Sequence, residues 1–321
     1  FFGLQTLTIG VFHYISIIND LPSAFSLSFI ILIIMLLLYV FEQKMRGNKK
    51  FNNSSYESIQ WSRYQLSKSK TVLVFFLSFL PIFFGFFIPL FFNFFIFVTN
   101  LQIIDYSNFL ASLYNSIILG CFVGFFCILV SIFINFYSRF SKNKKFLYYK
   151  KIINLGYALP GVVIALGVLI FVKYVNQFLQ LTILATFIGL ILALIIRLIS
   201  ISNNSIDSGL EKVGKSIDDA SRMLGRRSST TYFRIIIPQI RLSILAGFLL
   251  VFVDTIKELP ITLLLRPFNF NTLATSLYEY SSNEMFENGS LHALTIILFL
   301  SLVIYIFDSV IEKKQNSKVL K

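Results

Sequence analysis

The feature that most constrains this chain is a series of long apolar runs separated by polar segments. A helix needs about 20 consecutive apolar residues to cross a bilayer. In lipid the backbone has to satisfy its own hydrogen bonds, which favours helices. Only 13% of the residues are charged, about half the share of a soluble domain. We therefore predict an all-α integral membrane protein with one leading span and six more, at about 26–41, 71–98, 109–136, 152–172, 181–201, 242–256 and 290–311.

The distribution of positive charge predicts the orientation. The formal net charge is +13, but 25 of the 28 lysines and arginines fall on one side, in alternate inter-span segments, at the inner end of the fifth span or in the C-terminal tail. This is the positive-inside bias of membrane proteins, so we attribute the charge to topology and not to nucleic-acid binding. The linker 46–70, the segment 202–241 and the C-terminus are then cytoplasmic. We expect a multi-pass protein of the cell inner (plasma) membrane.

Prolines and single charges predict local departures from straight spans. Pro81 and Pro89 predict a kink in the second span, because proline breaks the backbone hydrogen-bond ladder. We expect 173–180 to form a short outer turn and 261–288 to lie outside or to be partly re-entrant. Arg197 lies near the inner end of the fifth span, where its side chain can reach the lipid headgroups.

The longest polar segment between spans carries an internal pattern, which comprises Asp218, Asp219, Ala220, Ser221, Gly225, the basic pair Arg226 and Arg227, Pro238 and Gly247. A segment of this kind between two spans predicts a helix–turn–helix that lies against the membrane and offers its turn to a partner. The alternative interpretation is an ordinary amphipathic surface loop.

Each residue type in this pattern suits contact with another protein. The small side chains of Ala220 and Ser221 let a partner surface come close. Asp218 and Asp219 are expected to meet basic groups on that partner. Gly225 can take the positive φ that ends a helix. A break before the next span is then expected at Pro238.

A second group of ionisable residues interrupts the apolar pattern after the sixth span. Asp254, Lys257 and Glu258 are spaced to share one helix face, where they can neutralise one another. Ionisable residues at membrane depth are expensive and often mark a pathway. Two interpretations stay open. The three residues form an ion pair that holds a helix bend, or they line a translocation route or its outer gate.

Other kinds of site are not expected. Gly209–Ser216 fits the phosphate-loop pattern G-x-x-x-x-G-K-S, but a true phosphate loop follows a buried strand, and residues 202–208 are polar. We interpret the match as chance and expect no nucleotide or other cofactor on this chain. Cys121 and Cys127 are not at a metal or disulfide spacing and are expected to fill the core. The spans offer no catalytic pair or metal cluster, so we predict no metal site and no enzyme activity.

The two ends of the sequence resemble each other. Gln5-Thr6-Leu7 through Tyr14 matches Asn271-Thr272-Leu273 through Tyr280 at a constant offset of 266 residues, which is 271 − 5. A span follows each copy and ends in a glutamate and a lysine. This predicts two homologous halves in one polypeptide.

The first residue is Phe1 and not Met, so we expect a part of a longer chain. We then predict the end of a first half at 1–45, a linker at 46–70, a second half at 71–312 with a core at about 109–312, and a tail at 313–321.

The pattern that starts at Asp219 resembles the EAA loop of permease subunits of type I ABC importers. Asp219 stands in place of the usual glutamate and Ser221 in place of the second alanine. Three other stretches resemble the iron(III)-uptake permeases of this class: Tyr157–Gly161, Asp254–Pro260 and Leu265–Ala274. The resemblance covers about 108–313.

The resemblance implies a permease without its own ATPase site. It implies as partners a cytoplasmic ABC ATPase dimer, which uses the ATP and docks on the loop, and an extracytoplasmic binding protein that delivers iron(III). Neighbouring families on the same scaffold carry thiamine, phosphonates, sulfate or polyamines. An ion-coupled secondary transporter or a channel is an alternative from another class. An intramembrane enzyme is a third.

Overall fold

The computed structural model describes residues 6–18, 20–46, 66–141, 149–150, 152–179 and 183–319. Within these ranges every regular element is helical, which confirms the predicted fold class. The first part of the chain contains α1 (Leu7–His13), η1 (Tyr14–Ile18), α2 (Leu21–Arg46), α3 (Lys68–Ile82), η2 (Phe83–Phe87), α4 (Ile88–Thr99) and α5 (Tyr106–Phe140). Most of the predicted linker 46–70 lies outside the described residues.

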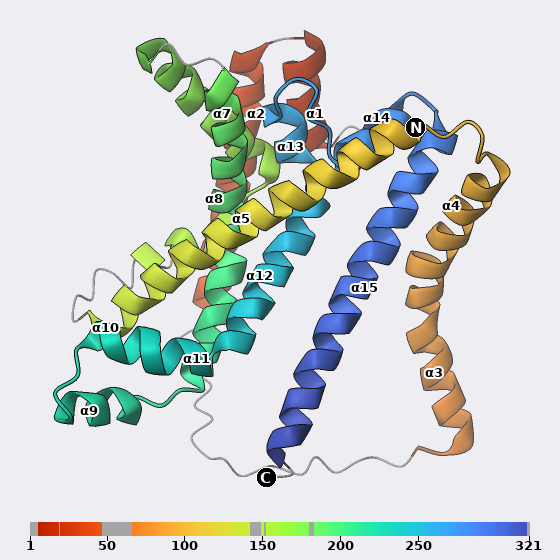
Figure 1. Cartoon of the computed structure of the whole chain (residues 1–321). Coiled ribbons are helices and arrows are strands. Elements are labelled where there is room, and N and C mark those ends of the chain that lie inside the picture. Colours follow the sequence, from red (N-terminus) through yellow and green to blue (C-terminus); the bar gives the residue numbers. More distant parts are fainter. Residues whose placement is uncertain are drawn as a thin grey trace.

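The described part of the chain after α5 contains eleven elements, of which the first, η3, belongs to a short connector. They are η3 (Gly156–Ala158), α7 (Gly161–Leu179), α8 (Ile183–Glu211), α9 (Ser216–Met223), α10 (Ser228–Thr231), η4 (Tyr232–Ile236), α11 (Ile237–Gln239), α12 (Arg241–Ile256), α13 (Pro260–Leu265), α14 (Leu273–Ser282) and α15 (Phe286–Val319). Figure 1 shows α9 and α10 at one end of the molecule and α1, α13 and α14 at the other. The α15 helix continues through most of the predicted tail.

Six helical segments of the described chain are long and apolar enough to cross a membrane. They are Leu21–Glu42, Lys68–Thr99, Tyr106–Phe140, Gly161–Phe178, Phe187–Glu211 and Phe286–Phe307. The seventh predicted span takes a different form. Its helix, α12, has 16 residues, which at 1.5 Å per residue is about 24 Å and short for a bilayer core. It is long and apolar enough to cross a membrane only together with Ser228–Gln239, from which it is bent by 73°.

The core is built where α5, α8 and α12 pack against one another. Small residues allow this close approach. A Cβ on Gly120 or Gly124 of α5 would lie 2.8 or 2.9 Å from the Phe252 or Phe248 ring of α12. Such small-residue contacts are typical of helix pairs in membranes, where backbones approach closely. Of the two cysteines, Cys127 fills this core as predicted, whereas Cys121 is exposed.

The second span, α3–η2–α4, lies to one side of this core, with α4 packed on α15 (Figure 1). The kink predicted there is a π turn, η2, which Pro81 and Pro89 flank on either side. A π turn is a usual way for a helix to absorb a break in its ladder. The α3 helix has no buried residue, so its phenylalanine-rich surface is left for lipid or another protein.

The predicted fourth span was placed too early. Residues 152–160 are not part of a span, and α7 runs instead from Gly161 to Leu179, through the stretch 173–179 that was predicted to be part of a turn. The cause is a close approach at Gly156. A Cβ there would lie 2.1 Å from the Ile196 carbonyl oxygen of α8. The connector therefore presses its backbone on α8, and the helix starts only after Pro160.

The sequence echo has a structural counterpart. Thr6 caps α1 by accepting a hydrogen bond from the Ile9 N–H, and Thr272 caps α14 in the same way. Phe12 and Tyr278 occupy equivalent positions of the two copies, 266 residues apart (278 − 12). Their rings are in edge contact, with 6.2 Å between centroids. The two similar helices therefore meet at the same position of each.

Candidate functional site: the α9–α10 turn and the cavity above it

The polar segment forms the predicted helix–turn–helix. The α9 helix ends at Met223, and Gly225 follows with a φ of +71°. The Arg226 N–H then donates to the Ser221 carbonyl oxygen at 3.0 Å. This left-handed residue with a bond reaching back into the helix is a common C-terminal cap, and it favours glycine because no Cβ interferes. The chain can then turn sharply into α10.

The tip of this turn is open. Asp219, Ala220, Gly225 and Arg226 are all exposed, and a Cβ added to Gly225 would meet nothing within 4 Å. The apolar side chains beside them, Met223 and Leu224, are 89% and 80% exposed.

Two of the predicted contact residues face inward instead. Asp218 is buried and accepts a hydrogen bond from Arg139 Nε of α5 at 2.8 Å. Ser221 is also buried, and its hydroxyl lies 2.6 Å from the hydroxyl of Thr231 in α10. These two residues hold the turn together and to its own chain. The expectation that Asp218 meets a basic group was right in kind, but the group belongs to this chain.

Arg139 is a site residue that was missed, because it stood among other basic residues at the end of a span. Its guanidinium also donates to three carbonyl oxygens, those of Leu210 at 3.3 Å, Val213 at 3.1 Å and Gly214 at 3.3 Å. The last carbonyls of a helix lack partners within the helix, and a cation there is favourable. Arg139 therefore caps the end of α8 and binds the start of α9.

The remaining features of the segment shape its path. Gly209–Ser216, the stretch with the phosphate-loop pattern, forms the last turn of α8, a short linker and the first residue of α9. It does not follow a strand. Pro238 is exposed in α11, just before the 73° bend that turns the chain into α12. The predicted break at Pro238 is therefore present.

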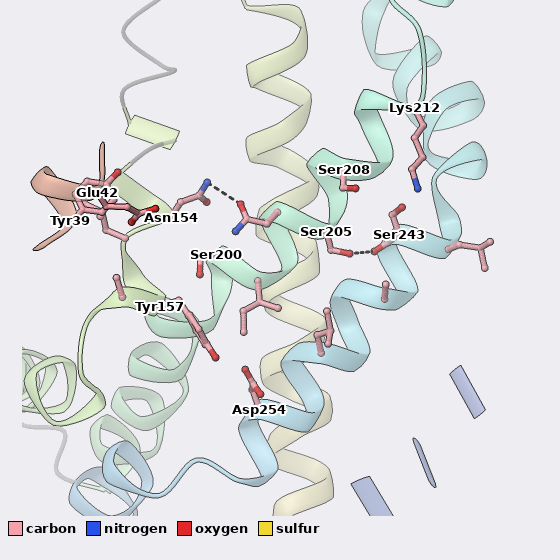
Figure 2. A pocket seen from close by; sticks show the side chains of 17 residues that line it. Tyr39, Glu42, Asn154, Tyr157, Ser200, Ser205, Ser208, Lys212, Ser243 and Asp254 are labelled. Atoms are coloured by element: carbon pink, nitrogen blue, oxygen red, sulfur yellow. Dashed lines mark hydrogen bonds between the residues drawn. The ribbon is translucent and has the colours of Figure 1, made fainter. Parts of the chain in front are cut away.

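A cavity of about 1190 Å³ lies between α2, the 154–158 connector, α8 and α12 (Figure 2). Hydroxyl and amide groups from α8 and α12 line much of it: Ser200, Asn204, Ser205, Ser208 and Ser243. Asp254 lies toward one end and Lys212 toward the other, and Tyr39 and Glu42 approach from α2. Apolar side chains, among them Leu155, Leu242 and Leu250, form the rest of the wall. A cavity with this many hydroxyl and amide groups among apolar helices can hold water and small hydrophilic solutes.

The sequence contained a signal for this wall. Ser200, Asn204 and Ser208 recur every four residues in the polar C-terminal part of α8, and such a spacing places side chains on one helix face. The charges at 254–258 instead indicated that group as a candidate for the translocation route, but of its three residues Asp254 alone is among those that line the cavity.

The three ionisable residues at 254–258 do not share one helix face. The α12 helix ends at Ile256, so Glu258 lies beyond it. Asp254 pairs with Lys257 at 2.7 Å. Glu258 is buried and pairs with Arg197 of α8, with 3.3 Å between Arg197 Nη1 and Glu258 Oε1. The group therefore forms two ion pairs, and Arg197 does not reach toward headgroups.

Gly161 makes room for the second pair. A Cβ there would lie 2.1 Å from Arg197 Nη1 and 2.8 Å from Glu258 Oε1. The ion pair thus lies directly on the first residue of α7. It ties α7, α8 and the segment after α12 together, close in sequence to the Asp254 end of the cavity.

Residues 128–317, more than half of the chain, match the family model described as binding-protein-dependent transport system inner membrane component. The chain belongs to this family. It is therefore a component of a transport system, with the all-α transmembrane domain of type I ABC transporters, and a multi-pass protein of the inner membrane. The match begins within α5 and includes α9, α10 and the bend at Pro238.

Two curated relatives are similar over much of this region. One is the Fe(3+)-transport system permease protein FbpB 2 of Haemophilus influenzae, 25% identical over 203 residues, which are 63% of this chain and 39% of that protein. The other is the ferric transport system permease protein FbpB of Actinobacillus pleuropneumoniae, 27% identical over 203 residues, which are 60% of this chain and 29% of that protein. The chain thus spans well under half the length of these relatives.

The described residues offer few side chains that could act as metal ligands. Among the described residues no group of three or more His, Cys, Asp or Glu side chains could hold a metal ion together. The carboxylates near the cavity are Asp254, already paired with Lys257, and Glu42 on the opposite wall. A cation in this space would be surrounded mainly by hydroxyl and amide oxygens and water.

Proposed function

We propose that this chain is the membrane permease part of an ATP-driven ABC importer, and that its substrate is iron(III). A cytoplasmic ATPase dimer docks on the α9–α10 turn, and an extracytoplasmic binding protein delivers the substrate. ATP binding closes the dimer, the turn moves with it, and access to the cavity switches between the two sides of the membrane. The open tip of the turn is the observation that carries this proposal.

The chemistry of the tip supports a protein partner. Met223 and Leu224 are almost fully exposed, and exposed apolar groups rimmed by polar residues are typical of interaction sites. Arg222, Arg226 and Arg227 surround them and are exposed as well. A partner surface that fits this tip has an apolar pocket with an acidic rim.

Orientation is part of the proposal. Arg222 lies in α9, Arg226 lies between α9 and α10, and Arg139 binds Asp218 of α9. Figure 1 shows α9 and α10 at the end of the molecule opposite α1, α13 and α14. Basic segments favour the cytoplasmic side. This supports a cytoplasmic turn and a cytoplasmic C-terminus, with α13 and α14 toward the outside.

The two-half organisation is proposed for the same reasons of symmetry. Equivalent positions that touch each other, as Phe12 and Tyr278 do, are what a pseudo-two-fold axis between two homologous halves produces. On this proposal α1 and α2 end a first half, and α14 and α15 end the second. The cavity wall of α8 and α12 then faces a matching wall of the first half.

Iron(III) as the substrate rests on the names of the relatives and on the cavity. Its wall of hydroxyl and amide groups can pass a hydrated or ligated cation without holding it tightly, and conduction requires weak binding along a route. Selectivity then belongs mainly to the binding protein. Thiamine, phosphonates and polyamines are the alternatives for the same architecture.

The test uses membranes that contain the full-length permease with its ATPase and binding protein. Gly225→Arg places a long side chain where φ is positive and the partner approaches, so the ATPase should no longer copurify and ATP-dependent uptake of radiolabelled ferric ion should stop. The matched control is Asn283→Arg, which adds the same side chain at an exposed site after α14. Retained uptake in Gly225→Arg would show that the turn is not the docking site.

The same membranes separate the rival functions. Uptake that continues without the ATPase but follows an ion gradient would indicate a secondary transporter. ATP-dependent uptake of thiamine but not of ferric ion would replace the substrate and leave the permease in place.

A further inference from the structure

We propose that Arg139 is the positioning residue that makes α9 move as one body with α5 and α8. This inference rests on the proposed docking of an ATPase at the turn, and it concerns how a displacement of the turn reaches the cavity. Arg139 lies on α5, a helix remote in sequence from the turn, and the docking surface itself does not use it.

The bonds of Arg139 join three parts of the chain that would otherwise be free to hinge. One guanidinium nitrogen binds Asp218 in the first turn of α9, and the other two bind carbonyl oxygens of the α8 end and of the linker 212–215. Both side chains of the ion pair are about nine-tenths buried, with 9% and 10% exposed. Asp218 also lies at a helix N-terminus, where a negative charge is favourable. On the arginine side the pair is held by several bonds, whereas the Asp218 side chain is held through Oδ2 alone, because its buried Oδ1 has no hydrogen-bond partner among the described residues.

A second attachment fixes the end of α10 to the same end of α5, through the first residue of η4, which directly follows α10. Tyr232 is fully buried, and its hydroxyl donates to the Ile132 carbonyl oxygen of α5 at 3.1 Å. Its ring packs on Phe136 and Phe140 of α5, with centroids 5.2 and 6.1 Å apart. Both arms of the turn are thus anchored on the last turns of α5, α9 by a charge and α10 by an aromatic ring.

From this anchor a polar seam runs along α5 and α8, buried at Asn135 and Asn203 and more exposed where it reaches the cavity. Asn135, one turn before Arg139, donates to Asn203 of α8 at 2.7 Å, and Asn203 donates to Asn154 of the connector at 2.7 Å. Asn154 in turn donates to Asn204 at 3.2 Å, and both of these side chains line the cavity (Figure 2).

The seam has two further cross-links between the same elements. The hydroxyls of Ser131 and Ser202 lie 2.6 Å apart. Lys150 donates to Asn135 at 2.9 Å and pairs with Asp207 of α8. Buried polar groups that are fully bonded rigidify the elements that they join. The end of α5, α8 and the connector therefore form one rigid unit that extends from the turn to the cavity wall.

Arg139 is the point where α9 joins this unit. Without it, α9 is attached to α8 through the linker 212–215, whose residues are not helical. An ATPase could still bind the exposed tip, but α9 would swing on the linker while α5 and α8 stayed in place. Docking and transmission are thus carried by different residues, and they can be separated by mutation.

The experiment follows access to the cavity, so it does not depend on which solute is carried. In the complete complex, with Cys121 and Cys127 replaced by alanine, Ser208→Cys on the cavity wall reports access to a membrane-impermeant thiol reagent from the cytoplasmic side. ATP with vanadate should slow this labelling about tenfold, the scale of a typical coupling between two sites. Arg139→Gln is then introduced. The control is Arg241→Gln, which also removes a positive charge at the same end of the molecule, because the exposed Arg241 makes none of these bonds.

We expect Arg139→Gln to copurify as much ATPase as the parent protein while ATP no longer changes the labelling rate. Spin labels at Ala220→Cys and Phe133→Cys should show a broader distance distribution in the variant. The charge exchange Arg139→Asp with Asp218→Arg should restore part of the ATP effect. If Arg139→Gln prevents membrane insertion, Arg139→Lys carries the test, because it keeps the charge and loses the forked bonds.

Two results would overturn the proposal. One is an unchanged ATP effect on labelling in Arg139→Gln and Arg139→Lys. The other is a loss of ATPase binding in these variants, which would make Arg139 part of the docking surface. Failure of the parent protein to bind any ATPase is a different result, and it would instead remove the proposed function.

Discussion

Two arginine–carboxylate pairs lie at opposite ends of the cavity region, and they are built differently. On the proposed orientation, the pair beside the α9–α10 turn is the inner one and the other is the outer one. At the inner end, Arg139 binds Asp218 at 2.8 Å and three carbonyl oxygens in addition. At the outer end, Arg197 makes one bond to Glu258 at 3.3 Å. The Arg197 Nε has no hydrogen-bond partner within the described ranges. All three guanidinium nitrogens of Arg139 are therefore bonded, whereas Arg197 Nε is not. Within the same ranges the buried Asp218 Oδ1 of the inner pair also lacks a partner.

Under the proposed function, this difference assigns a different role to the pair at each end. An arginine held by four bonds to three parts of the chain keeps one geometry, whereas a pair with a single long bond is held less tightly. An alternating-access cycle needs both properties, because two discrete arrangements must interconvert while the element that drives them stays rigid. The inner pair then serves transmission, and the outer pair serves closing and opening.

The largest effect is expected when the outer pair loses its cation. Arg197→Leu leaves the buried Glu258 carboxylate without its partner, which should lower the free energy of unfolding by about 3 kcal/mol. Replacing both, Arg197→Leu with Glu258→Leu, should recover most of that loss, because an apolar pair of similar size has no charge to desolvate. Thermal unfolding in detergent measures both. Equal stability of the single variant and the parent would show that Glu258 finds another partner.

A lysine at each arginine sharpens the comparison directly. Arg139→Lys keeps the charge but loses the forked donors, so two or three bonds of about 1 kcal/mol each disappear. Arg197→Lys loses little, because the existing pair uses one nitrogen. We expect a loss near 2 kcal/mol at the inner end and below about 1 kcal/mol at the outer end. The same loss at both ends, measured by denaturation of the purified protein, would remove the proposed difference.

The α7 helix offers a third comparison at the outer end. Gly161→Ala puts a Cβ against Arg197 and Glu258 and should cost about 1–2 kcal/mol, since the ion pair has to shift. Gly167→Ala, in the same helix, meets nothing within 4 Å and should stabilise by up to about 1 kcal/mol through helix propensity. A difference in melting temperature with this sign is the expected result. If the two variants match, the outer pair moves aside freely.

The sequence alone predicted the helical class, the helix–turn–helix and its glycine cap. These depend on local signals, namely apolar length, a helix-ending glycine such as Gly225 and a proline before a span. It did not predict that Asp218 and Ser221 face inward, because that depends on Arg139 and Thr231, the former 79 positions away (218 − 139). The Arg197–Glu258 pair was not predicted either, because its two residues are 61 positions apart (258 − 197). In addition, the sequence predicted a helix that continues past Ile256, with Glu258 on the same face as Asp254.

The close approach at Gly156 also lay beyond sequence reasoning. An apolar run with glycines is equally compatible with a span that starts at 152 and with a connector pressed on a neighbouring helix. What decides is the carbonyl oxygen of Ile196 on another element. Part of the cavity wall could be predicted from the sequence, because Ser200, Asn204 and Ser208 recur at helical spacing. That stripe carries no charge, however, and is a weaker signal than Asp254.

The smallest effect on stability is expected at the other outer ion pair, Asp254–Lys257. Lys257 is more than half exposed, and an exposed pair contributes at most about 1 kcal/mol, so Lys257→Gln should unfold almost like the parent. Its effect on transport should be larger than its effect on stability, because it releases the Asp254 carboxylate at the edge of the cavity. A cation on the route would then meet a free negative charge and leave more slowly. Uptake kinetics of the complete complex would show this as a lower maximal rate in Lys257→Gln, and Asp254→Asn, which removes that charge, should not show it. A melting temperature lowered as much as in Arg197→Leu would instead make this pair a structural element like its neighbour.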